Sequence, residues 1–272
     1  MRSSKLMKLF LATTVALAAL PMAMVNASAK TIRLDTETAA KGAVGIRIDE
    51  SADSSYKAKI AKGAFSYTYS IDRPDETNTV WLPLQMGNGD YEVSVFEHVT
   101  GNKYRVVLSE KLNVTVANEP DVYLNSVQNL DWSSAAKATA KAKELTKGLR
   151  TDKAKAAAIR DYIVKNISYD KALARKVTSE YVPDIDGTLA SGKAICYGYA
   201  TLYAAMLRSV GIPAKLAMGT TKLVDEYHAW NEVFLNGKWV VVDTTVDAGL
   251  DNGNAKAAFA KKASDYSAVK YY

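Results

Sequence analysis

With 272 residues, nearly half of them apolar, the chain is long enough for one large domain or two ordinary ones with a sizeable core. It has one cysteine and two distant histidines, so no cluster with ordinary metal-ligand spacing can be drawn, and no common phosphate-binding glycine loop is present. We therefore expect no metal and no cofactor. The formal charge of +6 falls to +3 when the three basic residues of a predicted targeting segment are removed, which argues against a nucleic-acid partner.

Residues 1–29 have the pattern of a signal peptide. A basic head precedes an almost wholly apolar stretch at 9–24, and Ala27-Ser28-Ala29 provides the small residues that a signal peptidase requires. The apolar stretch is shorter than the roughly 20 residues that span a bilayer and is broken at Pro21, so cleavage is favoured over a retained anchor. We expect a secreted protein, extracellular or associated with the cell surface, with no integral membrane span after cleavage.

Residues 30–118 predict an all-β domain. Short runs of β-branched and aromatic residues are separated by turn residues throughout this segment. Thr100-Gly101-Asn102 predicts a hairpin that leads into a strand at 103–108, and 112–116 adds a separate final strand. Roughly seven short strands of this kind predict a β-sandwich that resembles an immunoglobulin-like module. Such modules usually bind, space or orient other parts of a protein.

The pattern changes after Pro120, where helical periodicity begins. Residues 119–150 are predicted as a helical linker, and 151–272 as a second domain whose first helix has Thr151 at its N-cap position. A buried helix is then predicted at 196–210. The strands predicted after it are at 214–218, 229–235 and 238–243, the last two joined by Asn236-Gly237, a strong hairpin signal.

Cys196 is the only cysteine, although exported proteins are sent to compartments where disulfides persist. It begins the predicted buried helix directly after a loop at 192–195, where unpaired N–H groups and the helix dipole favour an anion. The thiolate is the nucleophilic form of cysteine. Cys196 is therefore a candidate nucleophile. The alternatives are a thiol that only packs in the core and a disulfide between two chains.

A cysteine nucleophile needs a base, and His228 is the candidate because the other histidine, His98, lies in the β domain. His228 is expected to open one strand of the Asn236-Gly237 hairpin, and Asp243 to close the other. Direct pairing across the two-residue turn places Trp230 opposite Asp243 and makes His228 and Asp243 diagonal neighbours, about 7–8 Å apart. Asp243 would then fix the imidazole tautomer. A strand-edge histidine and a strand-ending aspartate are the ordinary alternatives, but the combination favours a catalytic triad.

Four blocks of the sequence, together with their order, resemble the core of the transglutaminase-like superfamily in an exported bacterial type. The blocks are 192–200, 207–214, 228–231 and 239–245, within a match from about 154 to 246. The resemblance implies a papain-like α+β fold, with the Cys helix packed on an antiparallel sheet that bears the His and the Asp. It also implies thiol chemistry on amide bonds: acylation of the cysteine by a glutamine or peptide carbonyl, then transfer to an amine or to water.

Three aromatic residues are candidates for the oxyanion or substrate site. Tyr169 lies in a segment that resembles the helix end before the family's catalytic loop, and it is a candidate side-chain donor to the oxyanion, with packing as the alternative. Tyr197 follows the cysteine where many relatives have a small or polar residue. Trp230 is expected to line the cleft or shield the imidazole, with a core role as the alternative. Asn231 is expected to face solvent or the edge of the substrate.

The leading hypothesis is an exported cysteine-dependent acyl-transfer enzyme, either a transglutaminase or a cysteine protease or amidase. We expect a monomer whose partner is a protein or peptide substrate, with cell-wall peptides as one possible class. The alternative is a cell-surface or cell-wall binding protein with a catalytically silent core. A silent core would be expected to lack one of Cys196, His228 and Asp243, and the chain retains all three.

Overall fold

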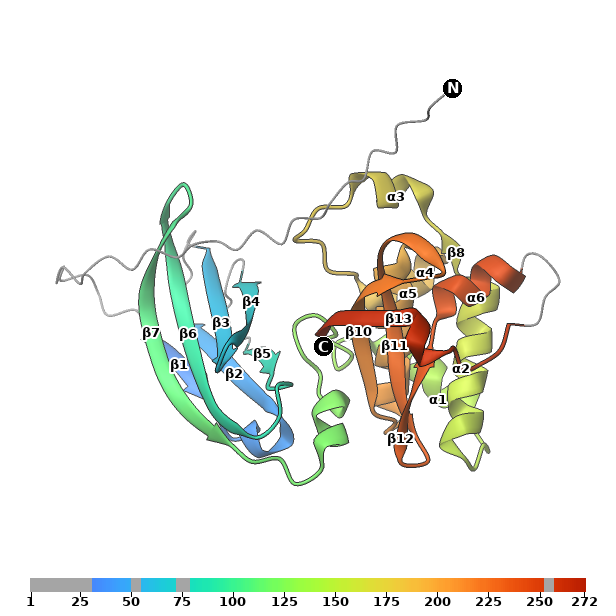
Figure 1. Cartoon of the computed structure of the whole chain (residues 1–272), viewed down its shortest axis with the longest axis horizontal. Helices are drawn as coiled ribbons and strands as arrows, with labels where there is room; N and C mark the ends of the chain where they lie inside the picture. Colours follow the sequence, from blue (N-terminus) through green and yellow to red (C-terminus); the bar gives the residue numbers. More distant parts are fainter. Residues whose placement is uncertain (1–30, 50–54, 72–78, 252–256) are drawn as a thin grey trace.

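The computed structural model describes residues 31–49, 55–71, 79–251 and 257–272. The predicted signal peptide at 1–29 lies outside the described residues. An all-β part comes first in the chain, and a mixed α/β part with an antiparallel sheet follows it (Figure 1). None of the described helices is long and apolar enough to cross a membrane.

The all-β part consists of two antiparallel sheets. One has the order β1-β2-β5, formed by Thr31–Asp35, Ala43–Asp49 and Val80–Pro83. The other has the order β4-β3-β6-β7, formed by Phe65–Ile71, Tyr56–Lys62, Gly89–Thr100 and Lys103–Val114. Alternate residues such as Tyr56, Ala58 and Ile60 on β3 are almost fully buried, as expected for strands with one face on a core.

The predicted hairpin at 100–102 joins β6 to β7, and Gly101 has a φ of 53°, which a glycine adopts without strain. The separate strands predicted at 103–108 and 112–116 are wrong, because β7 is one strand that stays paired with β6 down to the Val114–Gly89 pair. The polar run Ser109-Glu110-Lys111 resembles a turn in sequence. It is compatible with a strand because these side chains face solvent.

The α/β part is built on one antiparallel sheet with the order β12-β11-β10-β13. Its strands are Lys238–Val242, Val224–Leu235, Ala214–Thr221 and Tyr266–Tyr271. Helix α5, Cys196–Ser209, packs on β10 and β11. Around α5 lie α1, α2, α4 and α6, which are Ala136–Thr146, Asp152–Asn166, Ile185–Ser191 and Thr244–Asp251.

Several local predictions for this part are confirmed. Thr151 caps α2 by accepting a hydrogen bond from the N–H of Ala154. Asn236 and Gly237 have positive φ values of 51° and 78°, as the two central residues of a tight hairpin turn require. Strand β11 begins at Val224, earlier than predicted, so His228 lies inside the strand instead of opening it.

Short elements complete the α/β part, and the sequence did not predict them. Helix α3 is Lys171–Lys176, and the two-residue strands β8 and β9, Ser168–Tyr169 and Lys193–Ala194, pair in parallel. The described residues also form the 3-10 turns η2, Glu119–Leu124, and η3, Ala263–Asp265, while η1, Ala39–Lys41, belongs to the all-β part.

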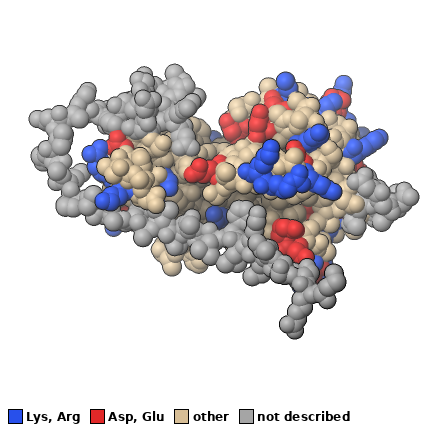
Figure 2. All heavy atoms as spheres, turned by 90° about the horizontal axis from the view of Figure 1, so that it is seen from above, with Lys and Arg blue, Asp and Glu red and all other residues tan. Residues whose placement is uncertain are grey.

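The two parts touch through the C-terminal strand. Gln85 of the all-β part donates a hydrogen bond to the carbonyl of Tyr271, and the rings of Tyr67 and Tyr69 pack edge-on against that of Tyr272, with centroids 5.8 and 6.2 Å away. Figure 1 shows the C-terminus between the two parts. On the face seen in Figure 2, basic and acidic side chains both lie over the α/β part, with a basic group near its middle.

Candidate active site

Cys196 is the first residue of α5, as predicted, and its side chain is half-buried. The N-cap residue, Ile195, has extended backbone angles and no side-chain oxygen, so no side-chain cap occupies the first-turn N–H groups. The rest of the helix is anchored by an apolar run buried from Gly198 to Leu207. A rigid, buried helix thus presents the thiol at the end where peptide dipoles favour a negative charge.

The predicted hairpin register is observed. Leu235 pairs with Lys238, and the pairing continues to Asn231 opposite Val242, so the next residues on the two strands are Trp230 and Asp243. The ring Nε2 of His228 lies 2.8 Å from Oδ2 of Asp243, and both side chains are buried. The two-residue turn therefore sets the register that brings these residues together.

The His228 ring is hydrogen-bonded to two groups, the carboxylate of Asp243 and the sulfur of Cys196. Because Nε2 is bonded to Asp243, Nδ1 is the nitrogen left to face the thiol. Burial disfavours the charged ring, but the hydrogen bonds to Asp243 and Cys196 and the charges of both groups outweigh it and raise the pKa of His228 to about 9. The ring is therefore an imidazolium at neutral pH, able to donate a proton.

Asp243 is fully buried, and its two carboxylate oxygens have different roles. Oδ1 accepts a hydrogen bond of 3.0 Å from the N–H of Val246, as an N-cap residue does at the start of α6. Oδ2 accepts from His228 and from the hydroxyl of Tyr266, which is 3.0 Å away. Three donors thus compensate for burying the carboxylate.

Trp230 is 1% exposed and lies parallel to the His228 ring, with centroids 6.3 Å apart and an angle of 18° between the planes. The indole also contacts the ring of Tyr266, with centroids 5.0 Å apart. The indole therefore shields one side of the imidazole from solvent, and it is also part of the core around β11. A role for Trp230 at the substrate cleft stays a prediction.

Tyr169 lies beside the start of α5, because β8 pairs with β9 and sets Tyr169 opposite Ala194, two residues before the cysteine. The Tyr169 side chain is 46% exposed. Burial of the rest of the ring raises the pKa of Tyr169, and the charges of Cys196 and Glu226 act in the same direction. The hydroxyl therefore stays protonated at neutral pH.

Tyr197 is oriented toward the chain segment that enters α1. Its hydroxyl accepts a hydrogen bond from Asn129 at 3.1 Å, and its ring contacts that of Tyr181 edge-on. Burial raises the pKa of Tyr197 to about 12. These contacts connect the first turn of α5 to the residues around Asn129.

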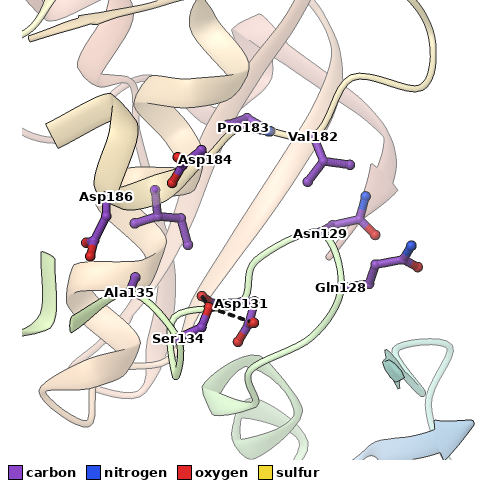
Figure 3. A pocket seen from close by; sticks show the side chains of 10 residues that line it. Gln128, Asn129, Asp131, Ser134, Ala135, Val182, Pro183, Asp184 and Asp186 are labelled. Atoms are coloured by element: carbon purple, nitrogen blue, oxygen red, sulfur yellow. Dashed lines mark hydrogen bonds between the residues drawn. The ribbon is translucent and has the colours of Figure 1, made fainter. Parts of the chain in front are cut away.

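Asn129 is also at the rim of a pocket of about 140 Å³ between α4 and the segment before α1 (Figure 3). The carboxylates that line this pocket already have hydrogen-bond partners within the protein. Asp186 accepts from the first N–H groups of α1, Asp184 caps α4, and Asp131 accepts from neighbouring serines. The pocket is lined by Gln128, Asn129, Asp131, Ser134, Ala135, Val182, Pro183, Asp184, Ile185 and Asp186.

The described residues include no group of three or more His, Cys, Asp or Glu side chains placed to hold a metal ion. Two residues important for the site were not predicted. Tyr266 lies on the C-terminal strand, far from the other blocks in sequence. Asn231 was expected to face solvent or the edge of the substrate, but it is fully buried, and its Nδ2 donates to the carbonyls of Ala200 on α5 and Lys215 on β10. That prediction is wrong, because one side-chain amide links the helix to two strands.

The site lies in a mixed α/β core. A cysteine starts helix α5, and the antiparallel sheet packed against this helix carries the histidine and leads into the aspartate. Residues 139–244 match the family model described as the Transglutaminase-like superfamily. This match agrees with the family resemblance that the motifs of the chain predict. The match contains Cys196, His228 and Asp243.

Other known proteins are similar to part of this chain. Mouse kyphoscoliosis peptidase is 35% identical over 82 residues, which cover 26% of this chain and 12% of that protein's length. A solved structure from Cytophaga hutchinsonii, proposed to be a cysteine protease, is 22% identical, with a TM-score of 0.40, over 55% of this chain and 53% of the other. A structure described as a TGase is 20% identical, with a TM-score of 0.35, over 56% and 44%.

Proposed function

We propose that the protein is an exported cysteine-dependent acyl-transfer enzyme that acts on peptide or isopeptide amide bonds. Cys196 is the nucleophile, His228 the general base and acid, and Asp243 the residue that orients and charges the imidazole. The observation that carries this proposal is the buried His228 ring, hydrogen-bonded on one side to Asp243 and on the other to the thiol at the start of α5.

In the first half of the proposed reaction, the Cys196 thiolate attacks the carbonyl carbon of the amide. The C–S bond forms as the carbonyl π electrons move onto oxygen, giving a tetrahedral oxyanion. The N–H of Cys196 at the helix start is one candidate donor to that oxyanion, and the hydroxyl of Tyr169 is a second. When the oxyanion collapses, the C–N bond breaks and His228 donates its proton to the leaving amine, which produces a thioester.

In the second half, an amine or water attacks the thioester carbonyl while neutral His228 takes the proton of the attacking group. The C–S bond then breaks, and the Cys196 thiolate and the His228 imidazolium are restored. An amine acceptor gives a crosslink, as in a transglutaminase, and water gives hydrolysis, as in a protease or amidase. The proposed substrate is a protein or peptide, with cell-wall peptides as one class.

We propose the division of the chain into a signal peptide at 1–29, a β-sandwich at 30–118, a helical linker at 119–150 and a catalytic domain at 151–272. The sheet orders β1-β2-β5 and β4-β3-β6-β7 support an immunoglobulin-like sandwich, because the third, sixth and seventh strands share a sheet opposite the first, second and fifth. The basic, apolar and small-residue pattern of 1–29 supports export and a secreted or surface location. A monomer is proposed.

The proposal is tested by mass spectrometry of Cys196 after incubation of the mature protein with glutamine-containing casein peptides and cell-wall peptides, with and without an alkyl amine. We expect a thioester adduct on Cys196 and a turnover that falls by at least about 10⁴-fold in Cys196→Ala. Amine incorporation identifies a transglutaminase, and free carboxylic acid product identifies a hydrolase.

Protein whose thiol has been blocked with iodoacetamide is a second control, because the added carboxamidomethyl group abolishes the nucleophile while the backbone and the other side chains stay the same. Equal turnover by the wild type and Cys196→Ala would contradict the proposal. Dimers on a non-reducing gel that disappear in Cys196→Ala would instead support an interchain disulfide.

A further inference from the structure

The carboxylate of Asp243 has a second side-chain donor besides His228. The hydroxyl of Tyr266 lies 3.0 Å from Oδ2, the same oxygen that His228 contacts at 2.8 Å. Burial, followed by the charge of Asp243, raises the pKa of Tyr266 well above its usual value, so the hydroxyl remains a donor wherever the protein is folded. One carboxylate oxygen is therefore shared by an imidazole and a phenol.

The Tyr266 ring is also packed into the site. It contacts Trp230 with centroids 5.0 Å apart, and Trp230 in turn lies parallel to His228. The three rings form a row along one side of the His–Asp pair. A rotation of the tyrosine would disturb both the hydrogen bond and the packing behind the imidazole, so its orientation is tied to that of His228.

Strand β13 brings Tyr266 to this position by pairing with β10, where Tyr266 is opposite Thr221 and Ala268 is opposite Gly219. The two strands come unusually close at Gly219, since a Cβ atom there would lie 2.0 Å from the carbonyl oxygen of Ser267. Only glycine permits this approach. Gly219 is itself paired with His228 on the other side, so the same point of β10 sets the position of both strands.

We propose that Tyr266 is a positioning residue of the active site: its hydroxyl holds Oδ2 of Asp243 in the plane of the imidazole and shares the negative charge of the carboxylate. This inference rests on the proposed function of Cys196, His228 and Asp243. The phenol touches neither the thiol nor a reacting bond, and it acts through Asp243. It limits rotation of the carboxylate and moderates its pull on the imidazolium proton.

The test is Tyr266→Phe, which removes the hydroxyl and keeps the ring against Trp230. Tyr271→Phe is the matched control, because Tyr271 lies on the same strand and donates to Glu232 at 3.0 Å, not to Asp243. We expect Tyr266→Phe to lower kcat for casein acyl transfer about tenfold with KM within about twofold of wild type. The alkaline limb of kcat/KM should move to higher pH, because a carboxylate with one donor fewer holds the imidazolium proton more strongly.

A second measurement does not depend on activity. The chain has two histidines, so ¹⁵N-histidine labelling with His98→Gln as the assignment variant isolates the Nε2–H signal of His228. We expect this low-field signal to move further downfield in Tyr266→Phe and to stay in place in Tyr271→Phe. An unchanged signal together with unchanged kcat in Tyr266→Phe would overturn the inference. A wild type that is inactive on every peptide would overturn the proposed function, and the His228 signal would still decide the role of Tyr266.

Discussion

The all-β part and the α/β part differ in what they bury. Among the described residues, the interior of the all-β part is almost wholly apolar, with Ile46, Ile60 and Val93 as typical members. The α/β part buries many polar and charged side chains around α5 and its sheet. They are Thr146, Thr188, Thr201, Arg208, His228, Asn231, Asp243, Thr244 and Asp247, whereas the described residues of the all-β part include two, Ser94 and Glu97.

Burying a polar group is unfavourable unless the group is hydrogen-bonded. Many buried polar side chains in one part of a molecule therefore require hydrogen-bond partners there. In the α/β part, the buried charged side chains have hydrogen-bonding or ion-pair partners. Arg208 donates to three backbone carbonyls, those of Asn125, Ala214 and Tyr272, while Asp247 is paired with Arg160 and Lys261. These networks hold the helices and strands that carry the candidate active site, whereas the buried side chains described in the all-β part are mostly apolar.

The two histidines provide the largest expected contrast, since one lies in each part. We expect His228→Ala to lower kcat/KM for casein acyl transfer by about 10³-fold, because it removes the general acid and base. His98→Ala should stay within about twofold, since the His98 ring lies in the all-β part, where it contacts the carbonyl of Gly101 and the ring of Tyr104. Steady-state kinetics of the two variants, with iodoacetamide alkylation of Cys196 as a second readout, measure the contrast. Equal losses of kcat/KM in the two variants would show that the loss does not arise at the candidate active site.

The alkaline limb of kcat/KM should depend on residues of the α/β part and not on those of the all-β part. Proton donation to the leaving amine needs the imidazolium, so kcat/KM should fall as the pH rises through about 9, the pKa of His228. In Asp243→Asn the hydrogen bond to a charged carboxylate and its charge are lost while burial remains, so the alkaline limb should move to lower pH. This direction is opposite to that expected for Tyr266→Phe.

Rate profiles between pH 6 and about 10.5, for the wild type and both variants, distinguish these shifts. The His98→Ala variant is the control and should keep the wild-type limb. A limb that stays at the same pH in Asp243→Asn would show that His228 is not the titrating group.

The sequence was sufficient to predict the parts of the site that depend on local signals. The helix start at Cys196 follows a loop, and Asn236-Gly237 determines a two-residue turn, so the register that joins His228 to Asp243 could be worked out by counting. The N-cap of α2 by Thr151 could likewise be predicted from a local sequence signal. Each of these features involves residues close together in the chain.

The parts that were missed depend on distant pairing. Strand β13 joins the sheet beside β10, and nothing in its own residues shows which edge it pairs with, so Tyr266 could not be connected to Asp243. Asn231 was misjudged because it is followed by the charged Glu232, although strand alternation directs neighbouring residues to opposite faces. In both cases tertiary packing decides the role of the residue.

The smallest expected effect concerns the contact between the two parts. The backbone N–H of Tyr271 donates to the hydroxyl of Tyr67 at 3.3 Å, so Tyr67→Phe removes one acceptor at the far end of β13 and keeps the ring contact with Tyr272. We expect a loss of about 1 kcal/mol in the free energy of unfolding, measured by urea denaturation.

The same substitution should change kcat less than about threefold, because the Tyr266 end of β13 is held separately by its pairing with β10 and by the close approach at Gly219. Phe65→Ala is the control for a general effect of substitution in the all-β part, since Phe65 is 72% exposed and belongs to the same strand as Tyr67. A tenfold fall in kcat in Tyr67→Phe alone would mean that the all-β part positions the active site through β13. In that case the two parts would act as one catalytic unit, joined by a strand that contacts Asp243 at one end and the tyrosines of β4 at the other.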